Sequence, residues 1–293
     1  MADSPAGVSV VVPTYSRPRE LTVCLRALAS LRYPRSRLEV IVVDDGNAEP
    51  VEPVVAAARA LLDVTLVRQP HAGPARARNE GARRAAGDLV AFTDDDCAPS
   101  PDWLAALTGR AARSPGNAVG GRTVNASPRN SYATATTLLV DYLVDRYNAA
   151  PEQARFLPSC NLLVPAARFR EVGGFDGSFA FPGGEDREFC ERWRRSGFEM
   201  SWAPEAVVHH TPAARLGPFL RQHFNYGRGA SRLQRAGLRA NGRAAPGEPL
   251  SFYVDLLRQP FSVVPRRRAM RLTALLLVCQ LATAAGYLRD RAW

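Results

Sequence analysis

The sequence predicts an α/β fold: a Rossmann-like, mostly parallel sheet flanked by helices, followed by a C-terminal helical extension. Three apolar runs indicate buried strands, namely Val8–Val12, Leu38–Val43 and Gly87–Thr93. Stretches of helical character separate these runs, as the crossover connections of parallel strands require. Polar residues follow each run directly, and such sheets bind ligands beyond the carboxyl ends of their strands. We therefore expect one site where the three strands end.

The remaining elements of residues 8–97 follow from breakers and capping residues. A strand is predicted at Val64–Val67, and helices are predicted at Arg17–Leu31, Pro53–Leu62 and Gly73–Ala86. Pro74 in the first turn and Gly87 past the end fit the usual capping asymmetry of helices. Residues 8–97 therefore fit βαβαβ packing.

Residues 98–215 carry a looser pattern of elements. We predict a helix from Pro99 to Ala112, a strand at Val119–Val124 and a helix at Ala133–Tyr147. The core resumes at Phe156–Pro165, and a glycine-containing loop leads into a helix at Glu185–Ser196.

A C-terminal extension is predicted for residues 216–293. An aromatic and basic helix at Phe219–Gly229 precedes a linker, 236–249, that is rich in Gly, Ala, Arg and Pro. A further helix, 269–288, contains a run of 17 residues without formal charge, Leu272–Leu288, which follows three arginines. That run is shorter than the roughly 20 residues that span a bilayer. Membrane association, packing on the rest of the protein and a true span are the three alternatives.

Composition restricts the partners. The 293 residues are 46% hydrophobic and 23% charged, with a net charge of +10 and no lysine. The charge favours anionic partners such as nucleotide diphosphates or acidic lipid headgroups, and no nucleic-acid motif accompanies it. Five dispersed cysteines and the absence of room for a signal peptide before the first strand indicate a cytoplasmic protein. Peripheral contact with the inner membrane leaflet is consistent with the basic C-terminal region.

Carboxylates follow two of the predicted strands. Asp94, Asp95 and Asp96 come after the third strand, and Asp44 and Asp45 come after the second. Carboxylates gathered at one rim repel one another unless a cation lies among them, and hard divalent ions bound to substrate phosphates are the usual solution. A helix N-cap is the alternative for the triplet, and a plain Asp-Gly turn is the alternative for the pair.

These segments resemble the family 2 glycosyltransferases of the GT-A fold. The matching motifs are Val10–Tyr15, Val42–Gly46, Gly73–Gly81, Phe92–Asp96, Gly173–Asp176, Gly183–Asp186 and Val207–His210. They occur in the family's order over roughly residues 8–215. The resemblance implies a catalytic domain over 1–215, with a nucleotide-sugar half at about 8–97 and an acceptor half at about 98–215.

The resemblance also implies roles for individual residues. Asp94 and Asp96 match the family's DxD motif and would bind Mn²⁺ or Mg²⁺, Asp96 directly, while Asp95 or Asp94 would reach the ribose or a metal-bound water. The expected nucleotide-sugar contacts come from both strand ends, the acidic triplet and the following helix: Pro13, Thr14, Tyr15, Asp44, Asp45, Arg78, Asp94 and Asp95.

Two further positions complete the implied site. Asp186 matches the aspartate that the family uses as catalytic base, and Glu185 would position the acceptor. His209 and His210 match the position of a metal-contacting imidazole. Because side chains alternate along a strand, only one of them faces the metal; we favour His209 slightly.

The function implied is an inverting, metal-dependent transfer of a single sugar from a nucleotide-diphosphate sugar to a glycan, lipid-linked or small-molecule acceptor. The Gln-x-x-Arg-Trp motif of processive synthases is absent. One rival is a nucleotidyltransferase, which would normally show a Gly-rich phosphate loop after the first strand. The other is a non-catalytic carbohydrate-binding or membrane-surface protein. The sequence identifies neither the sugar, nor the nucleotide, nor the acceptor.

Overall fold

The computed structural model describes residues 7–241 and 248–291, apart from the side chains of 238–241. The chain divides into two compact units. Unit 1 comprises the residues up to Val124 together with Asn148–Ala180 and Asp186–His210. Unit 2 comprises Asn125–Tyr147, Phe181–Glu185 and the residues from Thr211 onward.

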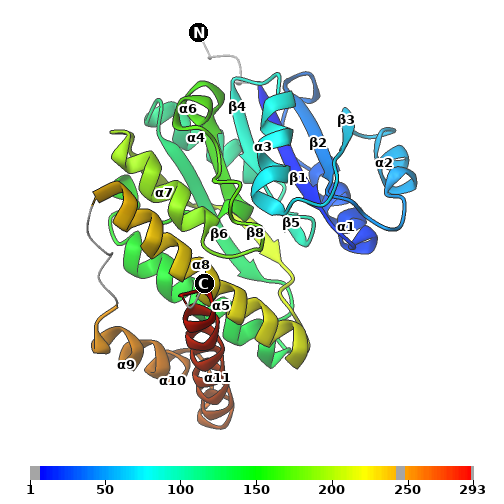
Figure 1. Ribbon diagram of the computed structural model, residues 1–293. Coiled ribbons are helices and arrows are strands. Elements are labelled where there is room, and N and C mark those ends of the chain that lie inside the picture. The colour runs from blue at the N-terminus through cyan, green and yellow to red at the C-terminus, as the bar shows by residue number, and fades with distance from the viewer. Residues whose placement is uncertain (1–6, 242–247, 292–293) are drawn as a thin grey trace. The chain divides into compact units, whose positions relative to one another are not determined.

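An eight-stranded sheet forms unit 1 (Figure 1). Its strands are β1 (Val8–Thr14), β2 (Leu38–Asp44), β3 (Val64–Arg68), β4 (Leu89–Phe92), β5 (Cys97–Pro99), β6 (Ala118–Asn125), β7 (Leu162–Pro165) and β8 (Met200–His210). The order across the sheet is β3-β2-β1-β4-β7-β6-β8-β5. The mixed α/β class predicted from the sequence is confirmed.

The first four strands are parallel, and helices cover both of their faces. β1 pairs with β2 and β4, and β2 pairs with β3. One face packs on α1 (Pro18–Ala29), α2 (Glu52–Ala58) and α4 (Trp103–Arg113). The other face packs on α3 (Pro74–Arg84), α6 (Ala166–Val172) and α7 (Glu185–Arg195). Strands buried on both faces explain why the sequence shows continuous apolar runs rather than alternation.

The second half of the sheet is antiparallel. β7 pairs with β4 and β6, and β5 pairs with β8. Asn161, which is fully buried just before β7, connects several elements of this half. Its Nδ2 donates to the carbonyl oxygens of Arg122 (3.0 Å) and Ala206 (2.9 Å), and its Oδ1 accepts from the Trp103 indole at 2.7 Å. One side chain therefore joins β6, β8 and α4.

Replacing Asn161 by Ala should destabilise the protein by about 3 kcal/mol, because it leaves a buried indole N–H without its acceptor, removes two further hydrogen bonds and opens a small cavity. Denaturant unfolding followed by tryptophan fluorescence measures this loss. Asn117→Ala is the matched control, because Asn117 is only partly buried and makes one side-chain bond to Ser201. An equal decrease in the free energy of unfolding in the two variants would contradict the stabilising role of Asn161.

Unit 2 is a helical assembly. It contains α5 (Ser131–Tyr147), α8 (Leu216–Asn241), α9 (Leu250–Arg258), α10 (Pro260–Val263) and α11 (Arg266–Arg291). Its core is built from buried residues of four helices: Ala135, Leu138, Leu139, Phe219, Phe252, Leu256, Leu272, Leu276 and Cys279. The predicted linker at 236–249 is wrong over its first part, because α8 continues to Asn241. Ala, Arg and Leu are good helix formers and outweigh one glycine there. Residues 242–247 of that linker lie outside the described residues.

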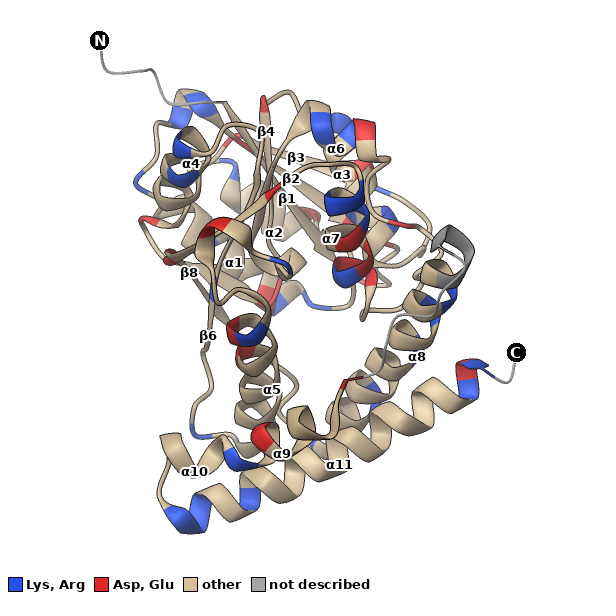
Figure 2. Ribbon diagram, turned by 90° about the vertical axis from the view of Figure 1, so that its left-hand side faces the viewer, with Lys and Arg blue, Asp and Glu red and all other residues tan. Residues whose placement is uncertain are grey.

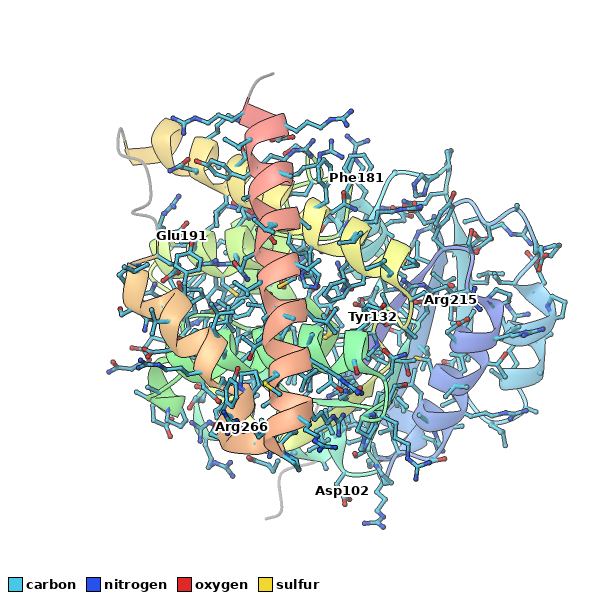
Figure 3. The ribbon with its side chains drawn as sticks, turned by 90° about the horizontal axis from the view of Figure 1, so that it is seen from below. Asp102, Tyr132, Phe181, Glu191, Arg215 and Arg266 are labelled. Carbon is cyan, nitrogen blue, oxygen red and sulfur yellow. The ribbon has the colours of Figure 1, made fainter. Side chains whose placement is uncertain are left out.

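Helix α11 packs closely on α8 (Figure 3, where Arg266 marks its first turn). A Cβ on Gly227 would collide with the backbone of Thr283, and a Cβ on Gly286 would collide with that of Phe224. At the end of α11 the buried Asp290 carboxylate forms ion pairs with Arg228, Arg232 and Arg235. Small residues and this charge cluster therefore hold the two helices together.

His223 of α8 is fully buried in unit 2. Its Nε2 lies 3.2 Å from the Thr136 hydroxyl, and its ring contacts the rings of Phe219 and Tyr226. Burial disfavours the imidazolium and lowers the pKa of His223 to about 4.

The free energy of unfolding should therefore fall as the pH drops from about 6.5, the usual pKa of a histidine, towards 4. In that pH range His223 is protonated in the unfolded chain but neutral in the folded protein. The free energy of unfolding therefore falls by at most about 3 kcal/mol. Urea unfolding at a series of pH values should show a shallower decline for His223→Gln than for the wild type. Parallel profiles for the two proteins would contradict the assignment.

Candidate active site

The acidic triplet lies at the carboxyl end of β4, next to the carboxyl end of β1. Asp95 is buried, whereas Asp94 and Asp96 are partly buried. After the triplet the chain enters β5, and α4 begins only at Trp103 with Asp102 at its N-cap position. The triplet therefore caps no helix, and its carboxylates are available for a site at the rim of the sheet.

Arg17 is the cation nearest to two of these carboxylates. It lies between β1 and α1, after Ser16, whose φ of 58° is uncommon for a residue other than glycine. Its Nη1 pairs with Asp96 Oδ2 and lies 3.2 Å from Asp95 Oδ1. Sequence reasoning did not single out Arg17, because nothing local distinguishes it from the many other arginines.

The second cation at the triplet is Arg78 of α3. Its Nη2 donates to Asp94 Oδ1 at 2.6 Å, and the guanidinium lies over the Phe175 ring, 5.7 Å from its centroid. The side chain is only 4% exposed. Arg78 is buried, and the first turn of α3 contains no acidic residue. Positive charge therefore lies at the rim of the sheet.

His210, at the end of β8, lies on the other side of Asp96. Its Nε2 is 3.4 Å from Asp96 Oδ1. His209 is exposed instead, with its Nε2 3.3 Å from the Ser100 hydroxyl. The slight preference for His209 is therefore wrong: β5 pairs with β8 so that Cys97 lies opposite His210, which sets His210 beside the triplet.

Burial and mutual charge shift the pKa values of this group strongly. Burial and the charge of Asp96 raise the pKa of Asp95 to about 7. For Asp96 the burial penalty is outweighed by His210 and Arg17, which hold its pKa at about 2. Burial is likewise outweighed at His210, where Asp96 raises the pKa to about 9. The carboxylate of Asp96 raises the pKa of Arg17 as well. Asp96 and His210 thus form a charged pair at neutral pH.

Thr14 and Tyr15 of the first strand end lie in this region too, after Pro13. Thr14 Oγ1 donates to Asp95 Oδ2 at 2.8 Å. Tyr15 is 46% exposed and stacks on His71, with ring centroids 4.1 Å apart. An exposed aromatic pair beside the carboxylates offers a flat surface for a nucleobase.

Asp44 and Asp45 are engaged by neighbouring protein groups. Asp44 Oδ1 accepts from the backbone and the side chain of Asn47, at 2.8 and 2.6 Å. Asp45 accepts the backbone N–H groups of Ala72 and Gly73, both at 2.9 Å, and fixes the loop that leads into α3. The arrangement is that of a structured turn, and their contact with a nucleotide remains a prediction.

Glu185 and Asp186 begin α7. Glu185 is 4% exposed, and its Oε2 accepts the Gly183 backbone N–H at 2.7 Å. Gly183 and Gly184 have φ values of 128° and 92°, and a Cβ on either would crowd α8 at Tyr226 or Gly229. Asp186 is partly exposed, with Oδ1 accepting its neighbour's N–H at 2.8 Å. Glu185 therefore shapes the loop, and Asp186 presents a carboxylate at a helix N-terminus.

The donor atoms at the triplet fit a divalent cation. Asp96, Cys97 and His210 each offer one, and all lie within 4.8 Å of one another. Burial raises the pKa of the Cys97 thiol well above its usual value, which makes it a poor ligand. Asp96 remains as a carboxylate donor, and His210 would add an imidazole donor on losing its proton to an arriving cation.

Comparison with known proteins identifies the family. The model of "Glycosyl transferase family 2" matches residues 9–173, more than half of the chain. This chain belongs to glycosyl transferase family 2. A second model, described as "N-terminal domain of galactosyltransferase", matches residues 145–213 and extends the similarity through β8. The resemblance drawn from the motifs is confirmed.

Relatives of this family 2 glycosyltransferase include enzymes of different pathways. Glycosyltransferase AglE of Haloferax volcanii is 26% identical over 96% of the chain and 95% of its own length. The pre-mycofactocin glycosyltransferase of Mycobacterium tuberculosis is 31% identical over 77% of the chain but only 47% of its own length. The succinoglycan biosynthesis protein ExoM of Rhizobium meliloti is 32% identical, over 77% and 74%. The chain thus spans only about half of the mycobacterial relative.

Solved structures share the GT-A fold of this glycosyltransferase. The mannosyltransferase PcManGT of Pyrobaculum calidifontis, solved with GDP-Man and Mn²⁺, is 20% identical, with a TM-score of 0.67 over 99% of the chain and 87% of PcManGT. TarS of S. aureus, residues 1–349 with UDP-GlcNAc, is 18% identical, with a TM-score of 0.55 over 97% of the chain and 90% of TarS. The expected fold is confirmed, and the chain is a glycosyltransferase.

Proposed function

We propose that this enzyme is an inverting, metal-dependent glycosyltransferase that moves one sugar from a nucleotide-diphosphate sugar to a hydroxyl of a glycan, lipid-linked or small-molecule acceptor. One observation carries the proposal: the acidic triplet at the end of β4 lies within contact of Arg17, Arg78 and His210. Carboxylates, an imidazole and two guanidiniums at one sheet rim are the groups that a cation and a diphosphate require.

Asp96 and His210 would hold Mn²⁺ or Mg²⁺, with Asp94 beside them. When bound, such an ion neutralises charge on a departing diphosphate. Arg17 contacts Asp95 and Asp96, and Arg78 contacts Asp94, so both guanidiniums lie at the triplet, where they would form charge-assisted hydrogen bonds with phosphate oxygens. Thr14 keeps Asp95 oriented, and the Tyr15–His71 stack offers a surface for the base.

Asp186 is proposed as the general base. The acceptor oxygen attacks the anomeric carbon from the face opposite the diphosphate, the bond to the diphosphate breaks, and Asp186 takes the acceptor's proton. Glu185 holds the Gly183–Gly184 loop that precedes the base, and so acts as a positioning residue.

The complexes of similar proteins support the proposed metal ion and the proposed class of donor. PcManGT was solved with GDP-Man and Mn²⁺, and TarS with UDP-GlcNAc. Both names describe nucleotide-sugar complexes of proteins with this fold. We propose the same class of donor here. We also propose that the enzyme works in the cytoplasm at the inner face of the membrane, since its net charge of +10 favours contact with anionic surfaces.

A donor screen tests the proposal. The purified protein is incubated with Mn²⁺ or Mg²⁺ and a panel of UDP-, GDP-, dTDP- and CDP-sugars, and slow hydrolysis is followed by release of the nucleoside diphosphate. Release from one donor that EDTA abolishes is the expected result. Absence of release together with absence of metal-dependent nucleotide binding would overturn the proposal.

A further inference from the structure

Large apolar side chains are exposed mainly on the last helices of unit 2. Among the described residues, nine of the fourteen exposed large hydrophobic side chains belong to the segment 250–288. They are Leu250, Tyr253, Val254, Phe261, Val263, Met270, Leu277, Leu281 and Leu288. Isolated exposed apolar residues are ordinary, but a concentration of them marks a surface that binds something apolar.

On α11 these residues form a single stripe. Met270, Leu277, Leu281 and Leu288 are spaced by seven, four and seven residues, which aligns them along one face of a helix. The buried residues of α11 occupy the opposite face: Ala269, Leu272, Leu276, Cys279, Gly286 and Asp290. One face of α11 therefore packs against the protein along the whole helix, and the opposite face is apolar and exposed.

By length and composition α11 could cross a bilayer: it has 26 residues and a mean hydropathy of 1.5 in its most apolar window. Its packing argues against a span. Gly227 of α8 lies against the backbone of α11, and Gly286 of α11 lies against the backbone of α8. Thr283 Oγ1 also donates to the His223 carbonyl at 3.2 Å. A crossing helix would also have to pull Asp290 away from three arginines. These contacts keep α11 on the surface of unit 2.

Arginines flank the apolar stripe of α11 at both ends. Arg266, Arg267, Arg268 and Arg271 lie at the start of α11, and Arg289 and Arg291 lie at its end (Figure 2, blue at both ends and tan between). Asp255 and Asp290 are the only acidic residues from 250 to 291, and Asp290 is already paired with arginines. A second copy of the chain would bring the same positive charge to this surface. An anionic bilayer complements it.

We propose that α9, α10 and α11 form a monotopic membrane-binding surface for anionic lipid. In this arrangement α11 lies parallel to the membrane plane. Its exposed stripe, with the exposed side chains of α9 and α10, enters the boundary between headgroups and acyl chains, and the terminal arginines contact lipid phosphates. The inference deepens the membrane location proposed above and does not depend on which sugar is transferred.

Vesicle flotation of the full-length protein tests the surface. The wild type should float with vesicles that contain phosphatidylglycerol, weakly with pure phosphatidylcholine, and less at high salt. The double variant Leu277→Ser/Leu281→Ser should bind the anionic vesicles on the order of a hundredfold more weakly. The matched control is Val23→Ser/Leu61→Ser, which alters two exposed apolar residues of unit 1 and should bind like the wild type.

Three outcomes would overturn the inference. Equal flotation of the two double variants would show that the stripe does not enter the membrane. Wild-type protein that stays in membranes after alkaline carbonate extraction would indicate a span. A lipid-free dimer that Leu277→Ser/Leu281→Ser dissociates would make the surface a contact between copies. Donor hydrolysis without vesicles reports separately on folding and on the proposed reaction, so it should be the same in both double variants.

Discussion

Replacement of Asp96 by Asn should abolish metal-dependent donor binding and lower turnover by at least about 10³-fold. Asp96 is the charged partner of His210 and the carboxylate best placed to bind the ion. An amide lacks the negative charge, and the loss of a metal's electrostatic contribution amounts to several kcal/mol, where each 1.36 kcal/mol is a factor of ten in rate. Calorimetric titration of nucleotide with and without Mn²⁺, together with initial rates, measures both effects.

Asp102→Asn is the matched control for this substitution. Asp102 lies six residues further along the chain, is 64% exposed, and pairs with Arg32 rather than with the site. Its variant should bind and turn over the donor like the wild type. An Asp96→Asn enzyme that retains the Mn²⁺ dependence of the wild type would show that the ion is held elsewhere.

Replacement of Asp186 by Asn should leave metal-dependent nucleotide binding intact and slow transfer by about 10²- to 10⁴-fold, the usual contribution of a general base. The side chain lies at the start of α7, and Asp186 is not among the residues proposed to hold the metal or the nucleotide. Binding and chemistry are therefore separable, and single-turnover measurements with saturating donor distinguish them.

The control for the base is Glu191→Gln on the same helix. Glu191 is partly exposed and pairs with Arg195, so its loss removes an acidic group of α7 without altering the proposed base. We expect wild-type transfer from it. Wild-type transfer by Asp186→Asn would instead refute the assignment of the base.

Much of unit 1 could be predicted from the sequence because its signals are local. Apolar runs at Val8–Val12 and Leu38–Val43 became β1 and β2, and the acidic triplet follows β4 as expected. Strand ends in a parallel sheet converge, so the location of the site follows from the order of elements alone.

The features that sequence reasoning missed depend on long-range pairing. Whether His209 or His210 faces Asp96 is set by the register between β5 and β8, two segments about a hundred residues apart in the chain. Arg17 reaches the triplet because of the backbone turn at Ser16 and the pairing of β1 with β4. No local pattern encodes either relation.

The C-terminal region differs from its prediction for another reason. Composition predicts a linker at residues 236–241, yet they continue α8. Helix α8 gains stability from its packing against α11, which includes the Asp290 cluster, and tertiary packing of this kind outweighs a weak local propensity. The same contacts hold α11 against α8.

The guanidiniums at the triplet have a thermodynamic consequence. Arg17, Arg78 and the protonated His210 already offset the negative charge of the acidic triplet before any donor arrives. A lone cation would have to displace Arg17 from Asp96, and a lone diphosphate would meet the carboxylates. Cation and diphosphate together bring almost no net charge, so each should raise the affinity for the other by the same factor. We therefore expect cation and donor to bind together, and each to bind only weakly without the other.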